Sequence, residues 1–196
     1  MRIISGSLKN LRLTIPAKAK IRPTSERLRE ALFSALGSSI HGIDVLDLFA
    51  GSGALGIEAL SRGAKSVTLV ERDLRLARNL MELRSNLKEP QAVEVLNMDV
   101  VKSLDYLSRE SAKFGVIFLD PPYDSNWILK LLSNETFLSL ISPAGLVVVE
   151  RAGCDKDLQF HNRYKLERIF SRKYGSSMLE IFSFVNSELS LYLESC

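Results

Sequence analysis

The chain has 196 residues, of which 46% are apolar and 25% are charged, and its formal net charge is +3. This composition is typical of one soluble globular domain with a substantial core, and no apolar run reaches the roughly 20 residues that a membrane span needs. Two cysteines and two histidines without metal-ligand spacing exclude a disulfide framework and a zinc or iron site. Because residues 1–6 carry no signal-peptide pattern, we expect a cytoplasmic, metal-free monomer.

Positive charge is concentrated at the N-terminus. Residues 1–30 contain eight lysines and arginines against two glutamates, so the rest of the chain is slightly acidic. Such a block can bind phosphates, although a solvated terminus would carry the same charges. Two short strand-like runs, Arg2–Ser5 and Asn10–Ile15, predict a β-hairpin around Gly6.

A helix is predicted after Pro23, because Thr24 or Ser25 can cap its first turn. Four apolar residues at helical spacing would share one face: Leu28, Ala31, Leu32 and Leu36. The charged residues of the segment would lie elsewhere on the helix: Arg27, Arg29 and Glu30.

From residue 44 onwards, strand-like runs alternate with helical patterns. Five buried-type runs occur in this region: Asp44–Phe49, Ser66–Glu71, Ala92–Asn97, Phe114–Asp120 and Gly145–Glu150. Runs spaced in this way predict a parallel sheet with helices on both faces. The last two runs, Tyr164–Arg172 and Met178–Phe184, are too close for a helical crossover and should pair antiparallel. The sequence therefore predicts an α/β, Rossmann-like fold with a mostly parallel seven-stranded sheet and a terminal antiparallel hairpin.

A glycine-rich turn follows the first of these strands. Gly51, Gly53 and Gly56 satisfy the dinucleotide pattern G-x-G-x-x-G, and Glu71 follows at about the 20-residue distance expected for a ribose ligand. Glycines let the backbone approach a ligand, and free N–H groups at a helix start favour anions. A nicotinamide or flavin enzyme is therefore one interpretation of the turn.

Two further carboxylates favour a different cofactor. Asp47 lies within the strand, where it suits the ammonium of an amino-acid ligand better than a pyrophosphate. Asp99 follows the third strand and could bind the exocyclic amine of an adenine, while Glu71 fits a ribose diol. The alternative for all three is that they cap helices. Their places at successive strand ends, where ligands bind in open α/β sheets, favour a binding role.

The fourth strand ends in Asp120-Pro121-Pro122-Tyr123. Two prolines hold the chain extended and donate no N–H, so carbonyl and carboxylate oxygens dominate the polar surface. Acceptors of this kind can hold the two N–H groups of a ring amine, and Tyr123 can stack on the base. In-line methyl transfer then depends mainly on positioning. A rigid turn with no chemical role is the alternative.

The chain resembles the bacterial 16S ribosomal RNA guanine-N2 methyltransferase family (RsmD type). The shared segments are Arg2–Gly6, Arg22-Pro23-Thr24 with the following R-L-R-E-A-L-F, Asp47–Leu60, Asp120–Tyr123 and Lys173-Tyr174-Gly175. The resemblance implies a Rossmann-like S-adenosylmethionine-dependent methyltransferase fold and methyl transfer to a guanine N2 amine. Its catalytic residues would be Asp120, Pro121, Pro122 and Tyr123. Its cofactor-binding residues would be Thr24, Asp47, Ala50, Gly51, Ser52, Gly53, Glu71, Arg72 and Asp99.

The expected partner is 16S ribosomal RNA or a small-subunit assembly intermediate. Five basic residues are predicted to contact the RNA: Arg2, Lys9, Arg12, Arg22 and Arg27. We divide the chain into a basic hairpin and linker (1–22), a methyltransferase domain (23–186) and a tail (187–196). An adenine-N6 methyltransferase acting on DNA or RNA, a nicotinamide-dependent oxidoreductase and a non-catalytic RNA-binding protein remain as alternatives.

Overall fold

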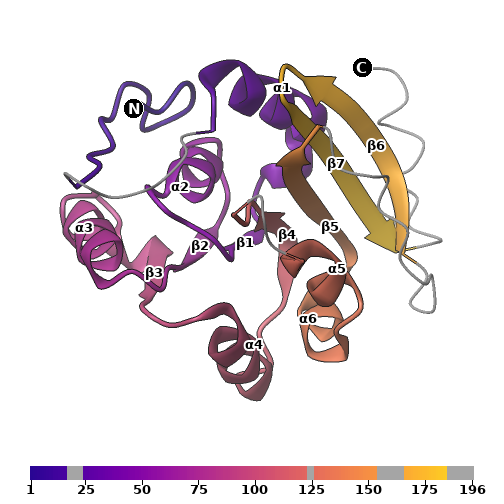
Figure 1. Cartoon of the computed structure of the whole chain (residues 1–196). Helices are drawn as coiled ribbons and strands as arrows, with labels where there is room; N and C mark the ends of the chain where they lie inside the picture. The colour runs from indigo at the N-terminus through magenta and orange to yellow at the C-terminus, as the bar shows by residue number, and fades with distance from the viewer. Residues whose placement is uncertain (17–23, 123–125, 154–165, 185–196) are drawn as a thin grey trace.

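The computed structural model describes residues 1–16, 24–122, 126–153 and 166–184. Within these residues one sheet of seven strands forms the centre of the molecule (Figure 1). The strands are β1 (Asp44–Asp47), β2 (Ser66–Val70), β3 (Val93–Leu96), β4 (Phe114–Leu119), β5 (Ile141–Ala152), β6 (Leu166–Tyr174) and β7 (Ser177–Phe184). The α-helices are α1 (Glu26–Leu36), α2 (Ala54–Ser61), α3 (Leu74–Ser85), α4 (Val100–Arg109), α5 (Trp127–Leu132) and α6 (Glu135–Ser139). Two 3-10 turns complete the set, η1 (Gly37–Ile40) and η2 (Pro90–Ala92).

The strand order is β3-β2-β1-β4-β5-β7-β6. β1 pairs in parallel with β2 and β4, and the parallel pairing extends to β3 on one side and β5 on the other. β7 is inserted antiparallel between β5 and β6. The predicted fold class, including the antiparallel pair at the end, is confirmed. No helix in the described part of the chain has both the length and the apolarity to cross a membrane.

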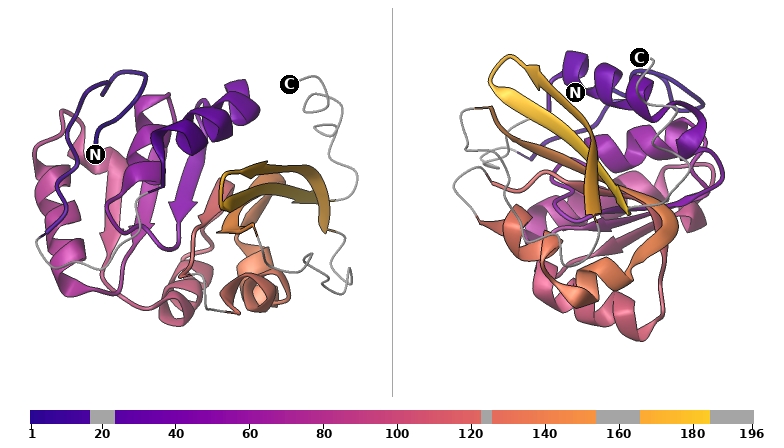
Figure 2. Two further views of the ribbon diagram at one scale, coloured as in Figure 1. Left: turned by 45° about the horizontal axis from the view of Figure 1, so that its top comes forward. Right: turned by 90° about the vertical axis from the view of Figure 1, so that its right-hand side faces the viewer.

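The sheet buries side chains on both faces, and the alternation along each strand assigns them to two separate cores. Val116 and Phe118 of β4 belong to the core under α1, α2 and α3. Ile117 and Leu119 belong to the core under α4, α5 and α6. Alternate residues of a strand point to opposite faces, so a continuous apolar run such as β4 marks a strand that is covered twice. Figure 2 shows the helices on both sides of the sheet.

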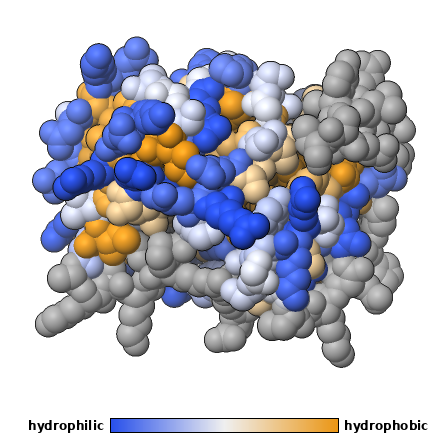
Figure 3. All heavy atoms as spheres, turned by 90° about the horizontal axis from the view of Figure 1, so that it is seen from above, coloured by the Kyte–Doolittle hydropathy of each residue, from blue (hydrophilic) through white to orange (hydrophobic). Residues whose placement is uncertain are grey.

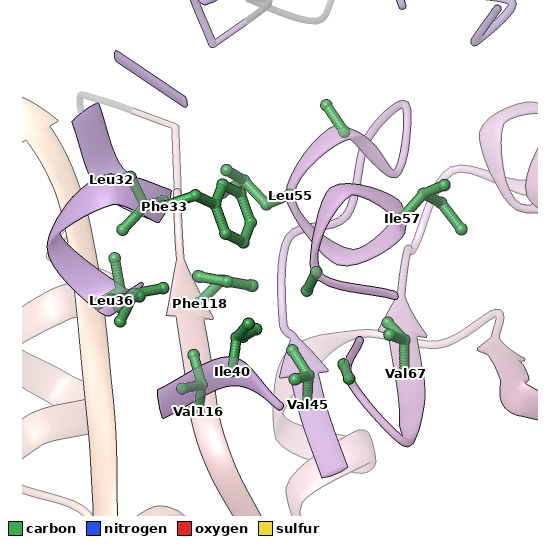
Figure 4. Close-up of a cluster of buried hydrophobic side chains, with 14 of the residues drawn as sticks. Leu32, Phe33, Leu36, Ile40, Val45, Leu55, Ile57, Val67, Val116 and Phe118 are labelled. Carbon is green, nitrogen blue, oxygen red and sulfur yellow. The ribbon is translucent and has the colours of Figure 1, made fainter. Parts of the chain in front are cut away.

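Helix α1 begins where the sequence predicted, with the Ser25 hydroxyl accepting the Leu28 N–H at 3.2 Å. Its apolar face packs on β4, where the rings of Phe33 and Phe118 meet edge to face at 5.9 Å (Figure 4). Arg29, expected away from the buried face, has no exposed surface at all. The expectation was wrong because a buried counter-charge on another helix, Glu58 of α2, pairs with it.

The first 13 residues form a hairpin with a single bridge, Arg2 to Arg12, and not the two predicted strands. The reason is that part of its backbone bonds to α2 and not to itself. The N–H groups of Ile4 and Ser5 donate to the carboxylate of Glu58, at 2.8 and 3.1 Å. Gly6 lies so close to α2 that a Cβ there would stand 1.8 Å from the Ser61 carbonyl oxygen. The hairpin is thus held on the sheet's helical layer.

Candidate active site

The predicted site residues come together at the carboxyl edge of the parallel strands. The register aligns Asp47 with Leu69 of β2 and with Phe118 of β4. Glu71 and Asp120 therefore each lie two residues beyond the position opposite Asp47. The edge where three neighbouring strands end is the usual ligand site of an open α/β sheet, and here each strand end carries a carboxylate.

The glycine turn between β1 and α2 is shaped for close approach. Gly51 and Gly53 have φ of 53° and 78°, in the left-handed region that glycine adopts without strain. A Cβ on Gly56 would lie 2.3 Å from Leu69 Cδ2, so its absence lets α2 rest directly on β2. Ala50 is buried, and its N–H donates to the Val70 carbonyl at 3.0 Å, which fixes the turn to the neighbouring strand.

Asp47 is almost completely buried, with 2% of its surface exposed. Its Oδ2 accepts the Gly56 N–H at 3.2 Å, whereas Oδ1 has no hydrogen-bond partner within the described residues. Burial raises the pKa of Asp47 to about 7, against the opposing effect of nearby backbone N–H groups. A buried acceptor with no partner costs free energy, and an ammonium group is the kind of ligand that would satisfy it.

Glu71 holds the glycine turn from the end of β2. Its Oε2 accepts the Gly51 N–H at 2.9 Å and its Oε1 accepts the Asp73 N–H at 2.7 Å. The Gly53 N–H donates to the Ala50 carbonyl. The N–H groups of these two glycines are therefore already bonded, and the expectation of free N–H groups was wrong for Gly51 and Gly53. Glu71 already accepts the Gly51 N–H, so this donor is not available to a pyrophosphate, which disfavours the oxidoreductase interpretation.

Two further predicted cofactor residues, Ser52 and Arg72, directly follow Gly51 and Glu71 in the chain. Ser52 is buried, and its hydroxyl lies 3.8 Å from the sulfur of Met1. Arg72 is exposed, and the carbonyls of Glu71 and Arg72 both accept the Asn97 side-chain amide, at 2.9 and 3.2 Å. The site prediction omitted Asn97, although it stands in the same Asn97-Met98-Asp99 turn.

Asp99 caps α4. Its Oδ1 accepts the Lys102 N–H at 3.1 Å, and its Oδ2 lies 3.9 Å from the Lys102 ammonium. Nearly half of the side chain is exposed. Capping, the alternative considered from the sequence, is therefore present at Asp99, and a role in adenine binding stays a prediction.

At the end of β4, Asp120 is joined to the start of α1. The Thr24 hydroxyl donates to Asp120 Oδ2 at 3.1 Å, across 96 residues of chain. Pro121 is buried and Pro122 is exposed, while Tyr123 lies outside the described residues. Thr24 was predicted to bind cofactor, and the partner observed for its hydroxyl is the predicted catalytic carboxylate.

Two aromatic side chains beside these strand ends were not predicted as site residues. The rings of Phe49, which follows β1, and Trp127, which begins α5, lie 6.2 Å apart. The Lys130 ammonium stands 5.5 Å from the centre of the Trp127 ring. Phe49 stands between Asp47 and Gly51, and that position is the signal that could have identified it.

The basic residues predicted to contact RNA are exposed where the structure describes them: Arg2, Lys9, Arg12 and Arg27. Arg2 lies 3.7 Å from Glu26 of α1. Arg22 lies outside the described residues. Across the described ranges, no group of histidine, cysteine or acidic side chains is arranged to hold a metal ion.

Comparisons with known proteins agree with this geometry. A family model described as conserved hypothetical protein 95 matches residues 1–183. A Haemophilus influenzae protein named ribosomal RNA small subunit methyltransferase D is 39% identical over 153 residues, covering 76% of this chain and 78% of the relative. The Escherichia coli K12 protein of the same name is 38% identical over 123 residues, covering 63% and 60% of the two chains.

Solved structures show the same fold. A hypothetical protein of Thermus thermophilus superposes with a TM-score of 0.72 at 34% identity, covering 94% of this chain and 99% of that one. The structure of SMU.776, a methyltransferase complexed with SAH, superposes with a TM-score of 0.63 at 21% identity, covering 80% of this chain and 48% of that one. At that identity the second match shows the fold alone.

Proposed function

Since the chain belongs to the family described as conserved hypothetical protein 95, we propose that it transfers a methyl group from S-adenosylmethionine to the N2 amine of a guanine in 16S ribosomal RNA. The family resemblance seen in the sequence is confirmed by this membership, and relatives in the comparison are named ribosomal RNA small subunit methyltransferase D. The observation that carries the proposal is the position of Asp120-Pro121-Pro122 beside the strand ends that bear Asp47 and Glu71.

S-adenosylmethionine fits the carboxylates of the site by its chemistry. Its amino-acid ammonium suits Asp47, whose Oδ1 is buried without a hydrogen-bond partner in the described structure. Its ribose hydroxyls suit Glu71, and its adenine amine suits Asp99. When bound, the cofactor would supply an electrophilic methyl group on a positively charged sulfur, and the carboxylates at this edge of the sheet would favour that charge.

Asp120 and the Pro121 carbonyl supply acceptors for the two N–H groups of the guanine amine. That amine is a poor nucleophile because its lone pair is delocalised into the ring, so holding both N–H groups turns the lone pair towards the methyl carbon. Thr24 fixes the Asp120 carboxylate for this task through the 3.1 Å hydrogen bond. Transfer would exchange the C–S bond of the methyl group for an N–C bond, and Asp120 or water would take the proton that the acidic product nitrogen loses.

The target guanine in a folded RNA must leave its stack to reach this edge, at a cost of a few kcal/mol. The exposed cations of the hairpin, Arg2, Lys9 and Arg12, would offset that cost through phosphate contacts. The proposal covers two substrates, 16S ribosomal RNA and a small-subunit assembly intermediate.

The test is mass mapping of modified nucleosides in ribosomal RNA from cells with and without the gene. The deletion strain should lack one N2-methylguanosine, which the wild-type gene restores and the Asp120→Ala variant does not. Loss of an N6-methyladenosine instead would show that the target base is adenine and not guanine. An unchanged set of modified nucleosides would contradict both activities and favour a non-catalytic RNA-binding protein.

A further inference from the structure

A groove of about 630 Å³ runs between helix α1 and the β6–β7 turn. α1 contributes Ser25 and Arg27 to its wall, and β6 contributes Phe170, Arg172, Lys173 and Tyr174. Its size lies within the range of about 300–1,000 Å³ that is common for ligand sites. The groove lies outside the cofactor turn, and of the residues that line it only Arg27 was predicted from the sequence to contact RNA.

The groove opens at the edge of the sheet that carries the active site. Leu119, the last residue of β4, pairs with Val149 of β5. Ala152 lies three residues further along β5 and pairs with Ser177 of β7. Ser177 pairs in turn with Tyr174, so the β6–β7 turn projects from the same carboxyl edge as Asp120. On the other wall, Ser25 directly follows Thr24, which donates to Asp120. One wall of the groove therefore begins one residue along the chain from Thr24, the hydrogen-bond partner of the catalytic carboxylate.

The chemistry of the walls is cationic and aromatic. Arg27, Arg172 and Lys173 are exposed, and none of the described residues that line the groove is acidic. Glu26 lies within 4 Å of Arg2 of the hairpin and does not line the groove. The guanidinium of Arg172 lies 6.0 Å from the centre of the Tyr174 ring, and the rings of Phe170 and Tyr174 are half-buried against the core. This side of the molecule carries hydrophilic side chains among smaller apolar patches (Figure 3).

We propose that this groove binds the single-stranded RNA that flanks the target nucleotide. Arg27, Arg172 and Lys173 contact its phosphates, and the half-buried rings offer a surface on which a base can stack. A nucleotide turned out of a stack leaves its neighbours partly single-stranded. The groove is placed to receive them, because its lining residue Ser25 directly follows Thr24, the partner of Asp120. The inference rests on the proposed function and extends the RNA surface from the hairpin to the other end of the sheet.

The test compares two double charge reversals in the full chain. Arg172→Glu/Lys173→Glu changes the groove, and Lys88→Glu/Arg109→Glu changes charge by the same amount at the opposite edge of the sheet, where α3 and α4 end. RNA binding is measured with 16S ribosomal RNA at several salt concentrations, and methyl transfer is measured with the labelled cofactor. The groove variant should bind RNA at least tenfold more weakly than the control and should show a raised KM for RNA. Both should bind S-adenosylhomocysteine within twofold of wild type.

A milder pair, Arg172→Gln/Lys173→Gln, guards against misfolding by the reversed charges. It should reduce the slope of log affinity against log salt by about 0.7 for each lost phosphate contact. If the groove variants match the control in RNA affinity and salt slope, and the enzyme methylates ribosomal RNA, the proposed role of the groove is overturned and the proposed function stands. Weakened RNA binding by the groove variants, with no methyl transfer by wild type to any RNA, would overturn the proposed function and leave the groove as an RNA-binding surface.

Discussion

Thr24 and Asp120 connect the start of the described methyltransferase core to its chemical centre. Thr24 has only 8% of its surface exposed, and its hydroxyl donates to Asp120 Oδ2 at 3.1 Å. The backbone that places it is fixed by α1, whose Phe33 packs on Phe118 two residues before Asp120. Thr24 is thus a positioning residue in the proposed mechanism, since it holds the carboxylate that would hold the amine.

We predict that Thr24→Val lowers kcat/KM for RNA methylation by about 10- to 100-fold, the effect of losing a hydrogen bond to a charged group of about 1.5–3 kcal/mol. Thr24→Ser, which keeps the hydroxyl, should stay close to wild type. Steady-state kinetics would measure both, and calorimetry would measure affinity for S-adenosylhomocysteine. A Val variant that loses cofactor affinity while keeping kcat would instead support the sequence-based assignment of Thr24 to the cofactor.

Asp47 makes the stability of the unliganded protein depend on pH. Burial raises its pKa from 3.8 to about 7, so between those values the folded chain holds a proton that the unfolded chain has released. Stability must then fall as the pH rises through this window. Asp47→Asn is neutral at every pH and can still accept the Gly56 N–H. The free energy of unfolding of wild type minus that of the variant should therefore decrease from pH 4 to pH 7, by at most about 4 kcal/mol.

Urea unfolding at several pH values, without cofactor, would measure this difference. Parallel pH profiles for the two proteins would show that Asp47 is ionised throughout and would contradict the effect assigned to burial. Saturating S-adenosylhomocysteine is expected to weaken the pH dependence, because an ammonium near Asp47 favours the ionised carboxylate.

At the scale of elements, one buried carboxylate holds the hairpin, α1 and α2 together. Glu58 of α2 accepts the Arg62 side chain at 2.8 Å, the Ile4 N–H at 2.8 Å and the Ser5 N–H at 3.1 Å, and its Oε2 lies 3.6 Å from the Arg29 guanidinium. Neither Arg29 nor Glu58 has any exposed side-chain surface. Arg29 also donates to the Arg2 carbonyl at 2.9 Å. Burial lowers the pKa of Arg29, and Glu58 opposes that effect.

Glu58→Gln should therefore destabilise the protein by about 3–5 kcal/mol, because it leaves Arg29 buried without its counter-charge. Glu82→Gln on the exposed side of α3 is the matched control, with an expected change within about 0.5 kcal/mol. Urea unfolding would measure the difference, and hydrogen exchange should show faster exchange at Ile4 and Ser5. Equal stability of the two variants would mean that Arg29 needs no counter-charge.

The hairpin that Glu58 holds is also the predicted RNA contact at this end of the molecule. Lys9 and Arg12 are exposed, so reversing both charges should leave the fold intact. We expect Lys9→Glu/Arg12→Glu to weaken binding to 16S ribosomal RNA by tenfold or more and to reduce its salt dependence. Filter binding across a salt series measures the affinity and its salt dependence, and Lys88→Glu/Arg109→Glu is the control variant. Unchanged affinity together with an unchanged salt slope would exclude the hairpin from the RNA surface.

At the scale of the whole molecule, the sheet could be predicted from the sequence because each buried strand carries its own local pattern. The predicted run Ser66–Glu71 became β2 with a difference of one residue, whereas β5 begins at Ile141, four residues before the predicted run. Pro143 concealed that start, since proline weakens a strand pattern. The carboxylates at the strand ends were predicted correctly in position because parallel strands end at one edge.

Contacts between distant segments could not be predicted in the same way. The burial of Arg29 depends on Glu58, which stands on another helix. A charged residue is predicted to be exposed unless its partner is known, so the sequence alone did not indicate this burial. The Thr24–Asp120 hydrogen bond and the groove beside it join segments about 100 to 150 residues apart. Neither has a local sequence pattern, because each exists only once the sheet has brought α1 beside β4 and β6.

The whole molecule should respond to its cofactor as one unit, because the site draws residues from three strand ends. A ligand at 100 times its dissociation constant stabilises a protein by about 2.7 kcal/mol, which for a domain of this size raises Tm by roughly 5–10 °C. We expect this rise with S-adenosylhomocysteine and none with NAD, because Glu71 occupies the Gly51 N–H that a pyrophosphate would need. Thermal unfolding with each ligand measures the difference. A rise with NAD alone would restore the oxidoreductase interpretation and contradict the assignment of Asp47, Glu71 and Asp99 to S-adenosylmethionine.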